Sequence, residues 1–192
     1  PPLRAPPCCL FFFCASSRAP RDLPSCPARR SSDLFTVFGP RHDPDGPDAA
    51  VIPKWIAAMI AGQPIIINGN GQTSRDFCYV ANVVQANLLA ATVTRKEAVN
   101  QMFNVALCAR TTLNQLFTLL LDSLLPYYPH LRTCRPVYQG FRPGDVLHSE
   151  ADISKAARLL GYRPSHTIGQ GLAEALDWYR ANAPAAKSGL RY

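Results

Sequence analysis

Two short segments carry charged side chains that suit an anionic, hydroxyl-bearing ligand. Arg75 follows the glycine-rich residues 68–71 and directly precedes Asp76, and the string FRPGD places Arg142 and Asp145 three residues apart. An arginine supplies the positive charge that a phosphate group needs, and an aspartate accepts hydrogen bonds from two hydroxyl groups. Two plainer interpretations stay open: Arg75 pairs with Asp76 at the surface, and FRPGD is an ordinary turn.

The start of a helix offers a second set of polar groups. Ala50 and Val51 open a helical stripe, and backbone N–H groups at such a position are free to bind a base carbonyl or a phosphate. Trp55, one turn further on, contacts either a ligand or the core. Asn68 contacts either a ligand or only its own turn.

Several motifs of cofactor binding and catalysis are absent from this sequence. It has no GxGxxG or GxxGxxG after a strand, no Tyr followed four positions later by Lys, and no GxSxG, HExxH or P-loop motif. Four isolated histidines, which predict no metal cluster, are His42, His130, His148 and His166.

The elements that must position these residues alternate between helices and short strands. Apolar residues at helical spacing predict helices over residues 49–61, 83–93, 113–125, 152–160 and 167–182. Short apolar runs predict extended segments over residues 65–67, 77–80 and 102–106. We expect Asn82 to begin the second helix, Thr112 to cap the third and Gly161 to end the fourth. The pattern predicts a mixed α and β fold without a complete parallel sheet.

Composition excludes several classes of protein. The 192 residues are 47% hydrophobic and 17% charged, which is enough to bury a core and argues against a wholly disordered chain. The apolar runs are shorter than a membrane span needs, so we expect no membrane association. Residues 1–34 hold +3 of the formal charge of +7, and the remaining +4 includes no Lys/Arg run, so no nucleic-acid partner is expected.

The first 34 residues differ from the rest of the chain. They are rich in proline and cysteine, and residues 30–34 spell RSSDL, which a common sequencing-adapter oligonucleotide encodes in one frame. We interpret residues 1–34 as a non-native segment, an assembly artefact, with a disordered extension as the alternative. Residues 185–192 are expected to form a frayed tail. Since the cysteines fit neither a zinc site nor a disulfide framework, we expect reduced thiols and a cytoplasmic protein.

Seven strings in the intervening residues 35–184 resemble one family. They are VFGPRHD, AAVIPKW, NGNGQTSRDF, NVA, FRPGDVLHS, ADI and GYRP. In this order they resemble the C-terminal half of extended short-chain dehydrogenase/reductases of the NAD-dependent epimerase/dehydratase family. The nearest branch is the UDP-N-acetylglucosamine 4-epimerases of polysaccharide biosynthesis. The resemblance covers about residues 35–182.

This resemblance implies the substrate-binding part of an extended Rossmann-type fold. In the family the N-terminal half carries the NAD fingerprint and the catalytic Ser and Tyr-x-x-x-Lys, none of which occurs here. NAD is therefore the cofactor of the family, and this chain is expected to be inactive alone. Family enzymes dimerise through their N-terminal half, so we expect no homodimer from this chain.

The same resemblance assigns a role to each matching residue of a UDP-sugar site. Arg75 and Arg142 correspond to ligands of the diphosphate, and Asp145 to a ligand of the ribose. Asn68 corresponds to a position at the base or ribose, Trp55 to one that lines the nucleotide pocket, and Ser149 to one near the sugar. Thr36 and His42 correspond to positions near the sugar and the nicotinamide side of NAD. The helix start at Ala50 and Val51 belongs to the same substrate site. Many relatives have Asn and Gln where this chain has Thr36 and His42.

Alternative functions stay open from the sequence. The chain could derive from another nucleotide-sugar epimerase or from a dehydratase of the same superfamily. It could also be a non-catalytic module that binds a nucleotide sugar or another protein.

Overall fold

Three small sheets and five α-helices form the part of the chain that this computed structural model describes, residues 37–42, 50–99 and 101–182. The strands are β1 (Val37–Phe38), β2 (Ile65–Asn68), β3 (Ser74–Arg75), β4 (Cys78–Tyr79), β5 (Thr111–Thr112) and β6 (Pro136–Gln139). The helices are α1 (Val51–Ile60), α2 (Val80–Thr92), α3 (Leu113–Leu124), α4 (Ser154–Leu160) and α5 (Ile168–Asn182). β1 pairs with β4 and β2 with β6 in parallel, whereas β3 pairs with β5 antiparallel. The predicted mixed α and β fold is confirmed.

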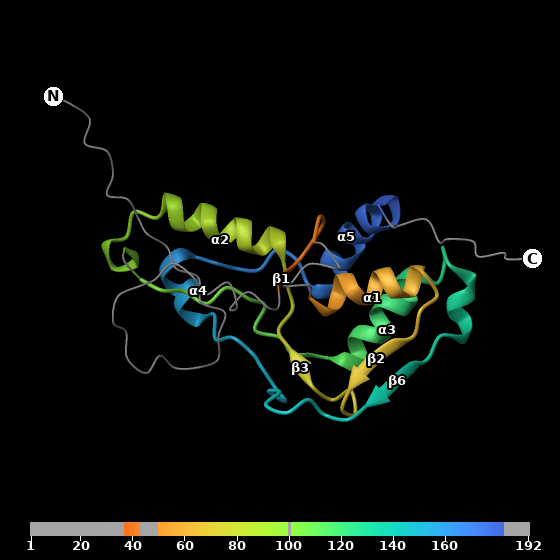
Figure 1. Ribbon diagram of the computed structural model, residues 1–192. Helices are drawn as coiled ribbons and strands as arrows, with labels where there is room; N and C mark the ends of the chain where they lie inside the picture. Colours follow the sequence, from red (N-terminus) through yellow and green to blue (C-terminus); the bar gives the residue numbers. More distant parts are fainter. Residues whose placement is uncertain (1–36, 43–49, 100, 183–192) are drawn as a thin grey trace, which may run out of the picture.

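The main core lies between the β2–β6 sheet and the helices α1, α3 and α5. Figure 1 shows α1 and α3 on one side of this sheet. Ile65 and Ile67 are buried on that side, while Ile66 and its register partner Val137 are exposed on the other. The alternation is that of a sheet with one covered face, which fixes the register of β2.

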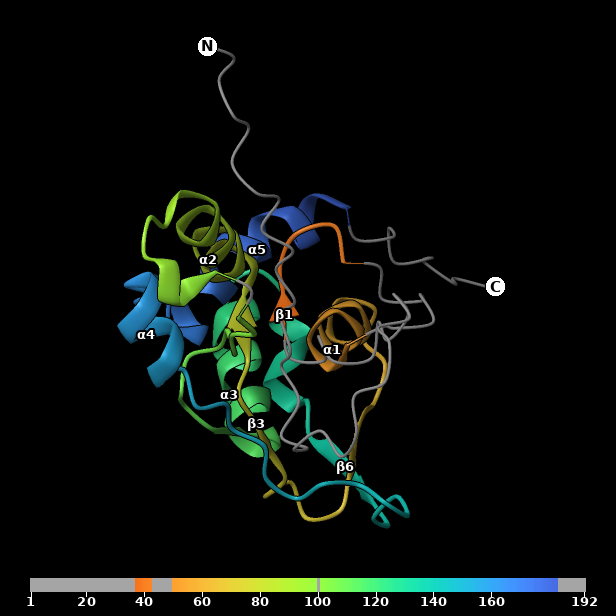
Figure 2. The ribbon, with the colours of Figure 1, turned by 90° about the vertical axis from the view of Figure 1, so that its left-hand side faces the viewer.

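A second, smaller core joins α2 to α4, and Figure 2 shows these two helices on the same side of the molecule. Ala86 and Ala90 of α2 pack there with Phe103 and Tyr162. The Tyr162 hydroxyl is buried and donates to the Ala106 carbonyl at 2.9 Å. Burial raises the pKa of this hydroxyl above its usual range.

Helix ends follow the local signals. Thr112 caps α3 through a capping box with Gln115, and α4 ends at Gly161 with φ of 73°. Both features were predicted. The helices otherwise differ from the predicted bounds by up to three residues, and the largest difference is α2, which begins at Val80.

Three sequence predictions about elements are wrong or incomplete. Asn82 does not begin α2 but is buried inside it, bonded to the backbone of Ser165 and His166. Residues 102–106 form no strand among the described elements; Phe103 and Val105 pack into the second core, while Met102 is exposed. β6 was not predicted, since only its long-range pairing with β2 makes it a strand.

Residues 1–34 and 185–192, on which we made predictions, lie outside the described residues. Within the described segments no helix has the length and apolar character required to cross a membrane. No group of three His, Cys, Asp or Glu side chains in those segments could hold a metal ion. The described cysteines, Cys78, Cys108 and Cys134, are free thiols.

Candidate functional site

The two segments that the sequence singled out lie side by side. Ser74 of β3 donates its N–H to the Leu147 carbonyl at 2.8 Å and accepts from the Ser149 N–H at 3.1 Å. A parallel bridge joins Ser74 to His148, and the Ser74 hydroxyl lies 2.9 Å from His148 Nδ1. These contacts hold residues 147–149, the end of the segment of residues 142–149, beside β3.

The Arg75 guanidinium is held at the centre of this contact. Its Nη1 donates to the Ser74 carbonyl at 2.9 Å and to the Val146 carbonyl at 2.6 Å. Its Nη2 lies 2.8 Å from Asp145 Oδ1, and both side chains are partly exposed, at 23% and 31%. The predicted ligand residues Arg75 and Asp145 are thus brought together across 70 positions of sequence.

Arg142 belongs to the same arrangement through a turn. The Asp145 N–H donates to the Arg142 carbonyl at 3.1 Å, and Gly144 within this turn has φ of 80°. The Arg142 side chain is exposed. FRPGD is therefore a turn, as the plainer interpretation held, and a ligand role for the exposed Arg142 side chain stays a prediction. Both statements about this string are compatible.

The suggested surface pair of Arg75 with Asp76 is wrong. Asp76 is only 3% exposed and accepts hydrogen bonds from the N–H groups of Leu107, Cys108 and Ala151 at 3.0, 2.9 and 3.4 Å. Burial raises the pKa of this carboxyl, and the backbone donors lower it in part. Asp76 thus joins the loop of Leu107 and Cys108 to the loop of Ala151 by hydrogen bonds. The sequence analysis did not predict this structural role. The position of Asp76 within the mostly apolar string RDFCYV could have indicated a buried carboxylate.

A second group of predicted residues lies at the start of α1 and the end of β2. Ala50 precedes α1 in extended conformation, and no side chain among the described residues caps this helix. The Val51 N–H therefore stands at an uncapped helix start, which suits an acceptor group of a ligand. Asn68 is half-buried at the end of β2. Trp55 is 7% exposed inside the main core, which is what its packing interpretation predicts.

The remaining predicted residues are only partly placed. Ser149 is half-buried and bonded through its backbone to β3. His42 is half-buried at the end of the described segment 37–42, and no hydrogen bond or ion pair joins it to another described residue. Thr36 lies outside the described residues. The roles of these three residues stay predictions.

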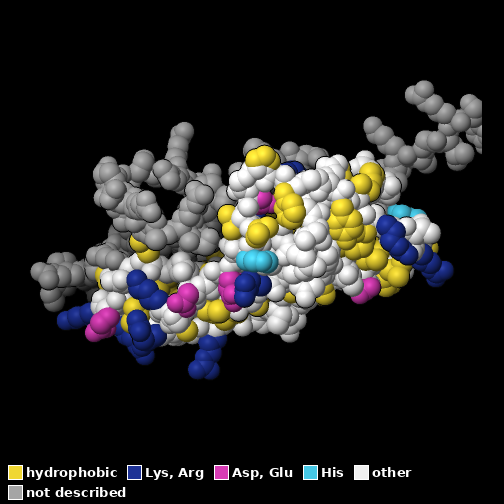
Figure 3. All heavy atoms as spheres, turned by 90° about the horizontal axis from the view of Figure 1, so that it is seen from below, with side chains coloured by type: hydrophobic (Ala, Val, Ile, Leu, Met, Phe, Trp, Pro, Cys, Tyr) yellow, Lys and Arg dark blue, Asp and Glu magenta, His cyan; other side chains and the backbone are white. Residues whose placement is uncertain are grey.

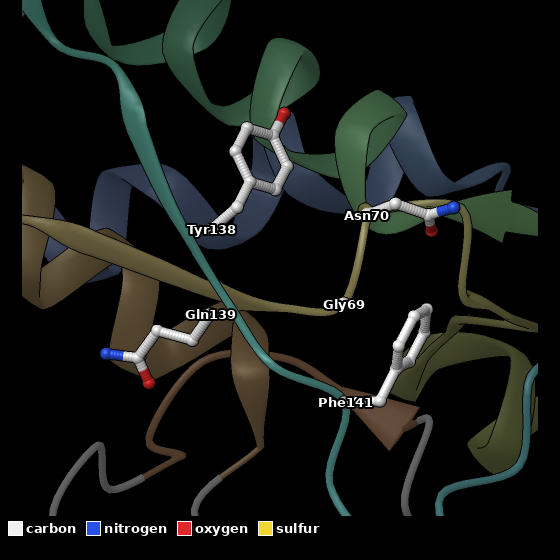
Figure 4. Close-up of a pocket in the computed structure, with 5 residues that line it drawn as sticks. All are labelled: Gly69, Asn70, Tyr138, Gln139 and Phe141. Carbon is white, nitrogen blue, oxygen red and sulfur yellow. The ribbon is translucent and has the colours of Figure 1, made fainter.

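An open pocket of about 480 Å³ lies between the ends of β2 and β6. Its lining residues, drawn in Figure 4, are Gly69, Asn70, Tyr138, Gln139 and Phe141. Gly69 has φ of 79°, and a Cβ there would lie 2.3 Å from the Phe141 ring, so only glycine fits. The sequence analysis named none of these five residues as ligands, although they directly follow Asn68 or precede Arg142.

The face seen from below, in Figure 3, combines exposed hydrophobic side chains with neighbouring acidic and basic ones. Ile66, Val137 and Tyr138 of β2 and β6 are among the exposed hydrophobic residues, between 45% and 52%.

Comparisons with known proteins bear on this arrangement. The model of the NAD-dependent epimerase/dehydratase family matches residues 30–106. The UDP-N-acetylglucosamine 4-epimerase of Methanobrevibacter ruminantium, solved with UDP-N-acetylmuramic acid, is 38% identical with a TM-score of 0.66, over 77% of this chain and 44% of its own. This chain belongs to the NAD-dependent epimerase/dehydratase family.

Other members of the epimerase/dehydratase family differ in reaction. The UDP-glucuronic acid 4-epimerase of Bacillus cereus, solved with UDP-glucuronic acid and NAD, is 26% identical with a TM-score of 0.62, over 77% of this chain and 43% of its own. A dTDP-glucose 4,6-dehydratase of Xanthomonas campestris is 32% identical over 76% of this chain and 40% of the relative. The chain thus spans less than half of the relatives it matches.

The described residues do not fit NAD. A dinucleotide needs a glycine-rich loop that leads from a strand into a helix N-terminus, where the pyrophosphate binds. Here the glycine-rich turn with Gly69 and Gly71 leads from β2 toward β3, not into a helix. We therefore derive no hydride-transfer step from these residues.

Proposed function

We propose that this chain supplies the nucleotide-sugar-binding part of a UDP-sugar 4-epimerase. The observation that carries the proposal is the contact of Arg75 with the segment that holds Arg142 and Asp145. It brings a cation and a carboxylate together, with the backbone of Arg142 in the same turn, and a ligand with a diphosphate and ribose hydroxyls requires such groups. UDP-sugars in the names of related structures support this choice.

Each residue has a distinct task in this proposal. Arg75 and Arg142 bind the diphosphate, and Asp145 faces the ribose hydroxyls. The uncapped start of α1 at Val51 and the end of β2 at Asn68 take the base. Ser149, beside β3, is assigned to the sugar, and so are Thr36 and His42.

Oxidation and reduction at the sugar lie outside this chain's own residues. The sequence lacks the glycine fingerprint and the Tyr-x-x-x-Lys pair, so the 192 residues bind substrate but do not turn it over. NAD, the cofactor of the family, is assigned to the share of the relatives that this chain does not match. A cytoplasmic location and a place in polysaccharide biosynthesis belong to the same proposal.

Isothermal calorimetry with UDP tests the proposal. We expect weak binding, near millimolar, which corresponds to about −4 kcal/mol, because Arg75 and Asp145 are partly exposed and water weakens charged contacts there. Arg75→Ala and Arg142→Ala should each weaken binding about tenfold, since each removes a charged hydrogen bond. Arg158→Ala, an exposed arginine of α4, is the matched control and should leave UDP binding unchanged. Equal UDP affinity in all four proteins would refute the site.

A dehydratase that uses dTDP-sugars is the second candidate, because a related protein has that name. The same titration with dTDP distinguishes the two functions. Tighter binding of dTDP than of UDP would favour the dehydratase, and the reverse order would favour the epimerase.

A further inference from the structure

Only some of the N–H groups of the Arg75 guanidinium have acceptors among the described residues. A guanidinium has five N–H groups in a fixed plane. Both N–H groups of Nη1 have carbonyl acceptors, on Ser74 and Val146, and one N–H of Nη2 has Asp145. Among the described residues this leaves the Nε–H and one Nη2–H without an acceptor. Two donors in one plane are what a phosphate group accepts in a bidentate contact.

The acceptors that hold Arg75 come mainly from one loop. Val146 and Asp145 both belong to the segment that Arg142 begins, and Asp145 is itself fixed by its N–H bond to the Arg142 carbonyl. A long arginine side chain loses considerable rotamer freedom when it binds a ligand. The contacts with Ser74, Val146 and Asp145 restrict that freedom.

We propose that Asp145 is a positioning residue, which holds the Arg75 guanidinium so that its Nε–H and remaining Nη2–H are ready for a phosphate group. This inference rests on the proposed function and changes the main role that family resemblance implies for Asp145, from ribose ligand to partner of Arg75. The Oδ1 atom carries the new role, through its 2.8 Å contact with Nη2.

The negative charge of Asp145 and its hydrogen bond to Arg75 have opposite effects on the binding of a diphosphate. A carboxylate beside Arg75 repels an incoming diphosphate, while its hydrogen bond fixes the arginine that attracts it. Asp145→Asn removes the charge but keeps an oxygen that accepts from Nη2. Asp145→Ala removes both. A comparison of these two variants therefore holds charge constant and isolates the acceptor.

Two ligands separate positioning from ribose binding. UDP and 2′,3′-dideoxyuridine diphosphate share the base and the diphosphate, but only UDP has the ribose hydroxyls. We expect Asp145→Ala to bind both ligands about fivefold more weakly than Asp145→Asn does, as the loss of one partly exposed charged contact predicts. A gap between the variants that appears with UDP and vanishes with the dideoxy ligand would overturn the inference. Equal affinities of the two variants for both ligands would overturn it too.

A spectroscopic measurement distinguishes positioning from a general loss of structure. The Arg75 Nε–H signal in a ¹H–¹⁵N spectrum, assigned with Arg75→Lys, should move toward that of a free arginine in Asp145→Ala and not in Asp145→Asn. Asp177→Ala on α5, which removes another carboxylate paired with an arginine, is the control and should leave that signal in place. An unmoved Arg75 signal in Asp145→Ala contradicts the inference.

Failure of the inference and failure of the proposed function are distinguishable. If Arg75→Ala weakens UDP binding but Asp145→Ala and Asp145→Asn bind alike, the diphosphate site stands and the positioning role falls. If Arg75→Ala leaves UDP binding unchanged, both fall.

Discussion

Asn82 should be among the most sensitive positions for stability, because its amide joins α2 to the segment before α5. It is fully buried, its Oδ1 accepts from the Ser165 N–H at 2.9 Å and the His166 N–H at 3.0 Å, and its Nδ2 donates to the His166 carbonyl at 2.9 Å. The Ser165 hydroxyl adds a bond of 3.2 Å. Replacement of Asn82 by alanine removes all of these hydrogen bonds together.

The expected cost follows from these bonds. A hydrogen bond contributes about 1 kcal/mol net, and a buried group left without its partner costs about 1–3 kcal/mol. Ser165 is exposed and His166 half-buried, so water can replace part of the loss. We expect Asn82→Ala to lower the free energy of unfolding by about 3 kcal/mol, a large share of the stability of a typical domain.

Urea unfolding at 25 °C, followed by circular dichroism, measures this loss. Asn87→Ala is the matched control, since Asn87 is exposed on the same helix. We expect it to stay within about 0.5 kcal/mol of wild type. If Asn82→Ala and Asn87→Ala unfold at the same urea concentration with the same slope, the assignment of Asn82 as a structural link is refuted.

Three further predictions concern pH, solubility and activity. Burial, with a smaller contribution from Asp76, raises the pKa of the Cys78 thiol from 9.0 to about 11. The pKa of this thiol is higher in the folded than in the unfolded chain, so its contribution to stability is complete below pH 9 and is lost as the pH rises toward 11. The free energy of unfolding should therefore fall by about 1 kcal/mol between pH 8 and 10. The fall should be smaller in Cys78→Ala. An exposed apolar stripe on α2 is formed by Val80, Val84 and Leu88, which are 37%, 50% and 62% exposed. A variant with Val84→Glu and Leu88→Lys should therefore aggregate less than wild type, as measured by light scattering. Equal aggregation of the two proteins would contradict this. The purified chain should not epimerise UDP-N-acetylglucosamine with added NAD, and measurable turnover would disprove this.

Local signals explain why much of the fold could be predicted. Thr112 and Gly161 mark helix ends by chemistry that acts within a few residues, and both act as expected. β6 has no comparable signal, because mostly exposed side chains leave only its pairing with β2 to define it. The apolar residues 102–106 suggested a strand because burial alone does not distinguish a strand from an irregular segment that fills a core.

The sequence suggested residues for the candidate site but not the contacts among them. The types and spacing of Arg75, Arg142 and Asp145 indicated ligand binding. The ion pair between Arg75 and Asp145 joins positions 70 residues apart in sequence. The backbone donors to Asp76 lie 31, 32 and 75 residues away. No pattern within one segment encodes such a contact. The pocket beside Phe141 depends in the same way on the approach of β6 to the turn at Gly69.

The central claim is that this chain binds the nucleotide of the substrate and not the dinucleotide cofactor. Titration of the ¹⁵N-labelled wild-type chain with UDP and, separately, with NAD tests it most directly. The account predicts that UDP shifts the signals of Arg75 and of residues 142–149 at millimolar concentration, while NAD binds more weakly or not at all. Tighter binding of NAD than of UDP, or UDP shifts confined to residues remote from Arg75, would contradict it.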